Sequence, residues 1–306
     1  MTRTTEMNNI IEERYNLSKS LYLIKKDTDK RNHEKMKQGD EPQQKLDIFT
    51  IPSHIKIMFG EFLKTPLYTE LANLRGHTDT VKCLTILKNK LYSGSWDNTI
   101  KIWNTETHEL VATLEGHTDM VKCLTILKNK LYSTSNDKTI RIWDTETYKE
   151  IATMRGHTNN VSSLIIHDNK LYSGSDDNTI RVWNTETHEL VATLRGHTNY
   201  VYCLAAFGNK LYSGSNDKTI KIWNTETYEE IATLKDTHPV ICIALHENKL
   251  YSGGVGKTIR IWNTETYAEI ANLRGHNGFV MCLTIRENRL YSGGAGADNT
   301  IRIWKI

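Results

Sequence analysis

The fold of this 306-residue chain is decided by the stretch KLYSGSWDNTIKIW at residues 90–103, which ends in Trp103. Near copies of the stretch recur about every 40 residues and end in Trp143, Trp183, Trp223, Trp262 and Trp304. Repeated units of this length cannot each bury a core alone and must stack on one another. The period therefore predicts a repeat architecture.

Each unit contains four short runs of apolar, β-branched and aromatic residues. In the first unit the runs cover residues 81–86, 91–95, 99–103 and 109–114. Turns are expected between them, the first at Asn89, because Asn and Asp tolerate the positive φ of tight hairpins. No helical period lies between the runs, so each unit is predicted to form a four-stranded antiparallel sheet.

Such a sheet has two apolar faces and can bury them only against neighbouring sheets. Radial stacking of the sheets also protects nearly all of their edges. We therefore predict an all-β chain that folds as a β-propeller of four-stranded antiparallel blades.

Two further marks accompany the tryptophans. Asn or Asp follows the first five of them, and a Gly-His pair opens five units at Gly76-His77, Gly116-His117, Gly156-His157, Gly196-His197 and Gly275-His276. By these motifs the chain resembles the WD-repeat (WD40-type) family, over six repeats from about Tyr68 to Ile306. The resemblance implies the propeller fold and a role in protein–protein interaction, but the fold hosts many partners and names none of them.

The resemblance also implies a structural tetrad of His, Ser, Asp and Trp in each repeat. A Ser, a His and an Asp taken alone would suggest a hydrolase. A set that is repeated five times is better explained as buried polar groups that satisfy one another. The expected tetrads are His77, Ser93, Asp97, Trp103; His117, Ser133, Asp137, Trp143; His157, Ser173, Asp177, Trp183; His197, Ser213, Asp217, Trp223; and His276, Ser292, Asp298, Trp304.

Residues 1–66 carry no Gly-His pair and include a polar, charged stretch at residues 27–44. Residues 45–58 nevertheless align without a gap under the opening stretch, with Met58 at the tryptophan position. We favour seven blades in one propeller domain, with residues 1–66 as a degenerate first blade and residues 27–44 as its hairpin insertion. The alternative is six blades from residues 67–306 that follow an N-terminal helical extension.

The last unit ends on its third run, so a segment near the N-terminus is expected to supply the fourth strand of that sheet. In the seven-blade arrangement this strand lies near Thr5 to Glu12. In the six-blade arrangement it is Leu71 to Arg75.

Composition disfavours several classes of partner. The chain has 39 Lys and Arg against 36 Asp and Glu, a net charge of +3, and lacks the strong basic excess of a nucleic-acid-binding surface. No apolar run is long enough to cross a membrane, and the N-terminus has no apolar segment of the signal-peptide kind. We expect a cytoplasmic protein, with a nuclear location left open, that has no membrane or small-molecule partner.

All five cysteines occupy one position of the first run of their units. Neighbouring sheets pack about 10 Å apart, and a disulfide requires Cα atoms within about 7 Å, so these residues are predicted to be small core residues. No metal-ligand spacing joins them, and no metal or cofactor is predicted. The five are Cys83, Cys123, Cys203, Cys242 and Cys282.

The segment SGGVGKT at residues 252–258 resembles the end of a phosphate-binding loop. The strict motif requires a glycine where Tyr251 stands, and it opens a helix. Here the segment aligns with residues 213–219 and precedes a strand-like run. We expect a β-turn in which Gly256 replaces the usual aspartate.

Positions that are equal in every unit serve the sheet, so a specific site is expected where the units differ. In WD-repeat proteins, partners commonly use the narrower end of the propeller, where three positions of each unit are exposed: the two that flank the opening valine of the first run and the one before the turn aspartate. In this chain these positions are Thr80, Lys82, Trp96; Met120, Lys122, Asn136; Asn160, Ser162, Asp176; Tyr200, Tyr202, Asn216; Pro239, Ile241, Val255; and Phe279, Met281, Ala297.

Aromatic and Met side chains anchor many interfaces, and charged side chains orient the partner. The predicted partner-binding residues are therefore Lys82, Trp96, Met120, Lys122, Asp176, Tyr200, Tyr202, Phe279 and Met281. The fifth and sixth units depart from the pattern at this same end, since residues 235–239 are one residue short and residues 294–298 are longer.

These observations predict a non-enzymatic scaffold that binds a protein segment at the narrow end. One alternative is an adaptor for ubiquitin-ligase or signalling complexes that works through its N-terminal segment. Another is an RNA-associated assembly factor, which the near-neutral charge disfavours.

Overall fold

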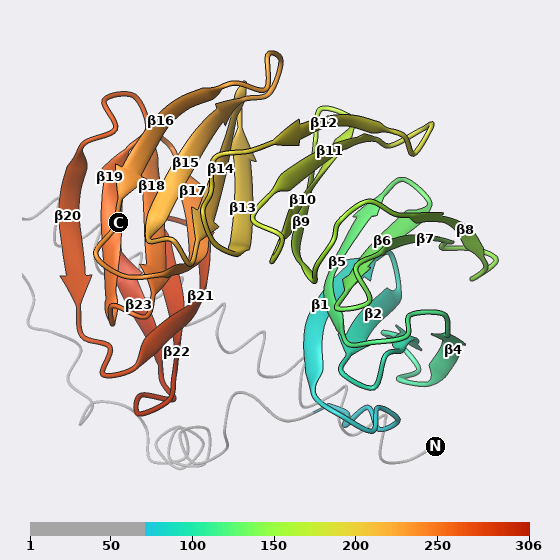
Figure 1. Cartoon of the computed structure of the whole chain (residues 1–306). Helices are drawn as coiled ribbons and strands as arrows, with labels where there is room; N and C mark the ends of the chain where they lie inside the picture. The colour runs from blue at the N-terminus through green and yellow to red at the C-terminus, as the bar shows by residue number, and fades with distance from the viewer. Residues whose placement is uncertain (1–70) are drawn as a thin grey trace, which may run out of the picture. The chain divides into compact units, whose positions relative to one another are not determined.

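The computed structural model describes residues 71–306, which form 23 β-strands (Figure 1). Residues 72–306 make up one compact unit. The predictions about the degenerate first blade, its insertion at residues 27–44, the strand near Thr5 to Glu12 and the alternative helical extension lie outside the described residues.

The strands form six antiparallel sheets, and in each sheet they pair in chain order. The first three sheets contain β1 (Val81–Leu87), β2 (Lys90–Ser95), β3 (Ile100–Asn104), β4 (Leu110–Leu114); β5 (Val121–Leu127), β6 (Lys130–Ser135), β7 (Ile140–Asp144), β8 (Glu150–Met154); and β9 (Val161–His167), β10 (Lys170–Ser175), β11 (Ile180–Asn184), β12 (Leu190–Leu194). The other three contain β13 (Val201–Phe207), β14 (Lys210–Ser215), β15 (Thr219–Asn224), β16 (Glu230–Lys235); β17 (Val240–His246), β18 (Lys249–Gly254), β19 (Thr258–Asn263), β20 (Glu269–Arg274); and β21 (Phe279–Arg286), β22 (Arg289–Ala295), β23 (Ile301–Lys305).

The innermost strands of successive sheets lie side by side, from β1 through β5, β9, β13 and β17 to β21. Figure 1 shows these strands toward the middle and β4, β8, β12, β16 and β20 at the outside. The prediction of stacked four-stranded blades is confirmed for five sheets, and the sixth has three strands among the described residues.

The first turn of each unit is a tight hairpin, but in most units the asparagine that the sequence singled out does not have the expected positive φ. In the first sheet Leu87 pairs with Lys90, and Lys88 rather than Asn89 has positive φ, at 54°. Only Asn169 and Asn288 show the expected positive φ among the turn asparagines. The pairing of the flanking residues imposes the turn geometry on whichever side chain stands there.

The core lies between successive sheets rather than within one. Apolar residues alternate along the third strand, so that Ile100 and Ile102 are both buried while Lys101 between them is half-buried. Burying an aliphatic or aromatic side chain of this size contributes about 1.5–3 kcal/mol. At the first junction the buried cluster consists of Tyr92, Ile100, Ile102 and Leu114 from the first sheet and Val121, Leu124, Leu131 and Trp143 from the second.

In the first four sheets a lysine at the start of the second strand joins its sheet to the next one. Lys90 Nζ donates to the Thr145 carbonyl oxygen at 3.3 Å and lies 4.7 Å from the centre of the Tyr148 ring. Lys170 and Lys210 make the same two contacts with the following sheets. A cation over an aromatic face adds about 0.5–1 kcal/mol at an exposed site.

The first and last sheets of the described range each leave an apolar face exposed. Leu84 and Ile86 of β1 are 61% and 65% exposed, and Ile301 and Ile303 of β23 are 78% and 62% exposed. The equivalent of Ile303 in the fourth sheet, Ile222, is fully buried by the neighbouring sheet. Residues 71–80 contain no strand, so Leu71 to Arg75 do not form the fourth strand that the six-blade arrangement would require.

The cysteines lie on the innermost strands, but the prediction that all are core residues is wrong for Cys282. The Cys242 thiol is buried and contacts the Val280 carbonyl oxygen of the next sheet at 3.4 Å. Cys282 is exposed because this position faces the following sheet, and β21 has none after it among the described residues. All five thiols are free.

Within the segment 252–258, residues 255–257 form the turn between β18 and β19, as predicted. Lys257 has positive φ, at 59°, as Lys218 does at the same place in the fourth sheet. A strand follows the turn rather than a helix.

Candidate functional site

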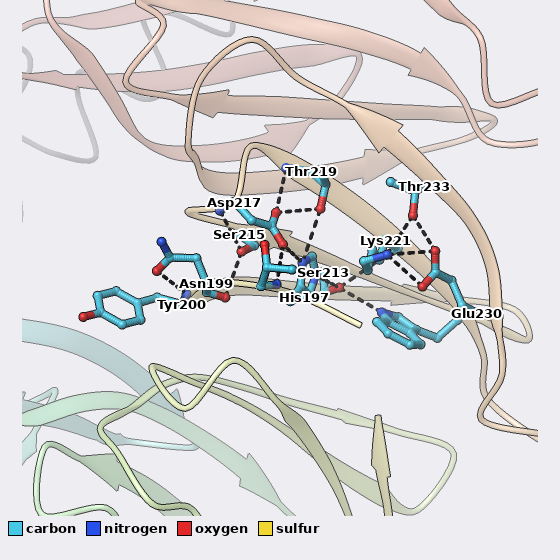
Figure 2. A network of polar contacts seen from close by, with 12 residues as sticks. His197, Asn199, Tyr200, Ser213, Ser215, Asp217, Thr219, Lys221, Glu230 and Thr233 are labelled. Carbon is cyan, nitrogen blue, oxygen red and sulfur yellow. Dashed lines mark hydrogen bonds and ion pairs between the residues drawn. The ribbon is translucent and has the colours of Figure 1, made fainter. Parts of the chain in front are cut away.

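A hydrogen-bonded tetrad crosses each regular sheet, and Figure 2 shows it for the fourth sheet. His197 Nδ1 lies 2.7 Å from Asp217 Oδ2, and His197 Nε2 lies 2.7 Å from Ser213 Oγ. Trp223 Nε1 donates to the same Ser213 hydroxyl at 2.9 Å. Because a carboxylate only accepts, Nδ1 carries the proton and Nε2 accepts from the serine. One serine thus links the histidine to the tryptophan.

The first, second, third and sixth sheets contain the same arrangement. The tryptophan indole donates to the serine hydroxyl at 2.8 or 2.9 Å in each of them. In these sheets the tetrads consist of His77, Ser93, Asp97, Trp103; His117, Ser133, Asp137, Trp143; His157, Ser173, Asp177, Trp183; and His276, Ser292, Asp298, Trp304.

The fifth sheet replaces the histidine by Asp236, which the sequence analysis did not recognise. Trp262 Nε1 donates to Ser252 Oγ at 2.9 Å, and Ser252 Oγ donates to Asp236 Oδ2 at 3.4 Å. Arg260 Nε forms an ion pair with the other Asp236 oxygen at 3.3 Å. The signal is in the spacing, since Asp236 precedes Ser252 by 16 residues, as each tetrad histidine precedes its serine.

The tetrad carboxylates are held in their ionised form. Burial alone would raise the pKa of Asp137, but hydrogen bonds from His117 and Thr139 outweigh it and lower that pKa well below 3.8. The pKa of Asp217 is lowered against burial in the same way by His197 and Thr219. A hydrogen bond from Thr300 is the main cause of a pKa of about 2 at Asp298. A carboxylate that accepts several hydrogen bonds favours its charged form.

The same polar groups fix the backbone at one end of the sheets. Ser215 Oγ donates to the Asn199 carbonyl oxygen at 3.0 Å and accepts from the Asp217 amide at 3.0 Å. The Asn216 amide donates to the Tyr200 carbonyl oxygen at 2.9 Å. In Figure 2 the Tyr200 ring points away from this network. We call this end of the sheets, which carries the loops before the innermost strands and the turns after the second strands, the narrow end.

Equivalent amide-to-carbonyl bonds hold four other sheets, at 2.9 to 3.2 Å. They join Trp96 to Thr80, Asn136 to Met120, Asp176 to Asn160 and Val255 to Pro239. Two of the three variable positions of these sheets are therefore paired with each other through the backbone. Their side chains differ from sheet to sheet, while the backbone that presents them is the same.

A cavity of about 500 Å³ opens at the narrow end. The second position of all six innermost strands, counted from the opening valine, contributes to its wall, so the cavity lies where the six sheets converge. Its lining consists of Lys82, Lys122, Ser162, Asp176, Tyr200, Tyr202, Asn216, Pro239, Ile241, Val255 and Met281. Every one of these residues belongs to the eighteen variable positions derived from the sequence.

The nine predicted partner-binding residues divide into two groups. Six of them line the cavity: Lys82, Lys122, Asp176, Tyr200, Tyr202 and Met281. Trp96 and Phe279 are exposed and Met120 is half-buried, but these three lie outside its lining. The cavity lining also includes Ile241, Val255 and Pro239. They are among the eighteen variable positions but not among the nine predicted binding residues, because that prediction favoured aromatic, Met and charged side chains.

The electrostatics of the cavity are uneven. Lys82 and Lys122 come from the first two sheets, while Asp176 lies in the third and accepts a hydrogen bond from Ser162 at 2.9 Å. Tyr200 and Tyr202 of the fourth sheet stack edge to face with ring centres 6.2 Å apart. Burial, with the nearby Asp176 carboxylate, raises the pKa of Tyr202 and keeps its phenol neutral.

The sequence profile described as "WD domain, G-beta repeat" matches residues 68–104, 108–144, 148–184, 188–224, 228–263 and 268–305. The chain belongs to the WD-repeat family. The second to sixth matches each begin just before the outer strand of one sheet and run through the first three strands of the next, so the sequence repeats are offset from the sheets by one strand.

The similar proteins add two observations. The chain is 50% identical over 42 residues to "Probable E3 ubiquitin ligase complex SCF subunit scon-2" of Neurospora crassa, and 51% identical over 39 residues to "Probable E3 ubiquitin ligase complex SCF subunit sconB" of Emericella nidulans. These alignments cover 14% and 13% of this chain and only 6% of the length of each relative. The crystal structure of the computationally designed Ika8 protein is similar with a TM-score of 0.70 and 31% identity, over 77% of this chain and 74% of that one.

Two further features of residues 71–306 bear on function. No cluster of three or more His, Cys, Asp or Glu side chains in this range is arranged to hold a metal ion. The same range contains no helix with the length and apolar character needed to cross a bilayer. WD-repeat proteins are generally non-enzymatic scaffolds for protein partners.

Proposed function

We propose that this WD-repeat protein binds a segment of a partner protein in the cavity at the narrow end. The observation that carries the proposal is that the backbone positions around the cavity are alike from sheet to sheet, while the side chains at these positions differ. The tetrads and backbone bonds are repeated in nearly every sheet, while the residues that they present to the cavity run from lysine through tyrosine to isoleucine and methionine. A wall that served only the fold would have no reason to vary in this way.

The dimensions and chemistry of the cavity suit an extended peptide. Ligand sites of about 300–1,000 Å³ enclose small molecules or a few side chains, and they combine apolar walls with a few polar groups. Tyr200 and Met281 are 40% and 38% exposed in the cavity wall, where aromatic and Met side chains commonly anchor a partner.

A capture experiment on the intact chain tests the proposal. Proteins retained by the unaltered chain are compared with those retained by Tyr200→Ala and by Ile241→Ala, which remove cavity side chains from neighbouring sheets. The matched control is Phe207→Ala, because Phe207 is 62% exposed at the opposite end of β13, the strand that Tyr200 precedes. We expect both cavity variants to lose the same captured proteins while the control keeps them. Equal capture by all variants with equal thermal melts would remove the cavity from consideration.

A second candidate function is a subunit of a ubiquitin-ligase complex. The resemblance of one repeat to the two SCF subunits favours it, although repeats of this family are similar to one another whatever their partners. In this arrangement the propeller selects the substrate and residues 1–44 reach the ligase. Removal of residues 1–44 would then abolish co-purification with ligase components while cavity-dependent capture persists. Loss of both activities together with a lowered melting temperature would instead indicate that these residues are needed for folding.

A further inference from the structure

The cavity at the narrow end has two chemically different walls. On one side Lys82 of β1 and Lys122 of β5 line it from neighbouring sheets, and neither ammonium group forms an ion pair with any residue in the range 71–306. Two adjacent cations of like charge raise the local potential and attract an anion from solution. This wall therefore favours binding of a negatively charged group of the ligand.

The only carboxylate in the lining does not neutralise the lysines. Asp176 belongs to the third sheet, accepts its hydrogen bond from Ser162, and lies beyond ion-pair distance of both ammonium groups. Burial raises the pKa of the neighbouring Tyr202, and the charge of Asp176 raises it further. Asp176 thus forms a border between the cationic wall and the rest of the cavity.

The opposite wall is apolar and carries no charge. It consists of the Tyr200 and Tyr202 pair from the fourth sheet, Pro239, Ile241 and Val255 from the fifth, and Met281 from the sixth. Asn216 is the one amide side chain in the lining. Contact with an apolar side chain here removes both surfaces from water, at about 25 cal/mol for each Å² buried.

The geometry points to one class of ligand for the proposed site: an acidic peptide segment that places Asp or Glu side chains against Lys82 and Lys122 and a neighbouring large apolar side chain against Tyr200, Ile241 and Met281. This inference rests on the proposed function and specifies the chemistry of the partner. The charged contact orients the segment and speeds its encounter with the protein, while the apolar contact supplies most of the affinity.

Selection of peptides on the intact chain tests the inference without knowledge of the natural partner. A phage-displayed library of random dodecapeptides is selected on the unaltered protein, and the affinity of the recovered peptides is measured by fluorescence anisotropy at low and high salt. We expect peptides enriched in Asp or Glu beside Leu, Phe or Tyr. Their affinity should fall with rising ionic strength, because exposed charge pairs are screened by salt.

The variant Lys82→Glu, Lys122→Glu should bind these peptides at least about tenfold more weakly, which corresponds to about 1.4 kcal/mol. The matched control is Lys88→Glu, since Lys88 is an exposed lysine next to the other end of β1. Thermal melts of both variants must equal that of the unaltered chain before affinities are compared.

The outcomes separate the two proposals. Peptides that lose affinity with Tyr200→Ala but contain no acidic residues and are indifferent to charge reversal would overturn the inference and leave the proposed function standing. Peptides indifferent to both variants, or no enriched peptide, would overturn both. Displacement of the acidic peptides by single-stranded polyuridylate at lower concentration than by free peptide would assign the cationic wall to nucleic acid and overturn the inference.

Discussion

Ser163 occupies the innermost-strand position that cysteine holds in the other five sheets. Its side chain is buried, and its hydroxyl has no hydrogen-bond partner within the range 71–306. A buried unpaired hydroxyl costs about 1–3 kcal/mol, whereas a thiol behaves there as a small apolar group. Burial raises the pKa of the equivalent Cys203 to about 12, so that thiol remains neutral.

The variant Ser163→Cys is therefore expected to raise the free energy of unfolding by about 1 kcal/mol. Urea titration followed by tryptophan fluorescence measures it as a higher midpoint at an unchanged slope. The reciprocal variant Cys203→Ser should lower the midpoint by a similar amount. A lower midpoint for Ser163→Cys would mean that the hydroxyl has a partner, such as a bound water.

The ionised tetrad carboxylates predict an acid limit to stability. Their folded-state pKa values are lowered, so the stability that they contribute is present above the ordinary value of 3.8 and is lost as pH falls toward the folded-state values. We expect a melting temperature that is nearly constant from about pH 7 to pH 5 and drops below about pH 4.

A matched pair of variants attributes this drop to the tetrads. Asp217→Asn removes one tetrad carboxylate, so the melting temperature should be lower at neutral pH but fall less steeply below about pH 4. Asp168→Asn removes a carboxylate that is 73% exposed, and its pH profile should match that of the unaltered chain. Parallel profiles for all three proteins would show that the acid limit comes from other groups.

At the scale of a strand and its turns, the fifth sheet shows how one deletion changes the local design. The shortened loop brings the Pro239 carbonyl oxygen so close to Gly254 that a Cβ atom there would lie 1.9 Å from it. In the fourth sheet the equivalent residue is Ser215, whose hydroxyl bridges Asn199 and Asp217. The fifth sheet thus replaces a serine bridge by a direct approach of the backbone.

Gly254→Ser, which restores the residue of the first four sheets, should therefore destabilise the protein by about 2 kcal/mol or more, because the loop must shift to make room. The converse change Ser215→Gly should cost about 1 kcal/mol through lost hydrogen bonds. Differential scanning calorimetry of both variants measures the two effects. A stabilising Gly254→Ser would show that the loop moves freely and that the close approach has no structural role.

The repeated elements could be predicted because each strand position is sampled six times in one chain. Alternation of buried and half-buried residues in a run such as Ile100 to Trp103 then stands out from local variation. Details that depend on backbone geometry could not be predicted in this way. Positive φ falls at Lys88 because pairing across the hairpin decides it, and Asp236 takes the histidine position because a deleted residue shifts the register of the loop.

At the scale of the whole molecule, the candidate site is formed where the six sheets converge, and no single repeat contains it. Sequence comparison between units located the positions that line the cavity, since the residue after the opening valine of the innermost strand lines it in every sheet. It could not decide which side chains reach the cavity. Trp96 and Phe279 have the chemistry of interface anchors but are not part of its lining, because the lining depends on loop paths that composition does not encode.

The seven-blade prediction concerns the apolar faces that the first and sixth sheets expose within residues 71–306. If a seventh sheet covers them in the intact chain, Ile303→Asp should destabilise the protein by at least about 2 kcal/mol, because a carboxylate would be buried without a partner. On the surface described for residues 71–306 alone, where Ile303 is 62% exposed, the same change would cost under about 0.5 kcal/mol.

Ile222→Asp gives the loss of stability expected for a fully buried residue, since Ile222 holds the equivalent position and is fully buried. Chemical denaturation of the intact chain compares the two variants, and light scattering at several concentrations shows whether a second copy covers the face instead. We expect Ile303→Asp to approach the cost of Ile222→Asp in a monomer. An unchanged midpoint for Ile303→Asp would contradict the seventh blade. A loss of stability confined to concentrations at which the chain self-associates would assign these faces to a dimer, because only then does burial depend on the concentration of the protein.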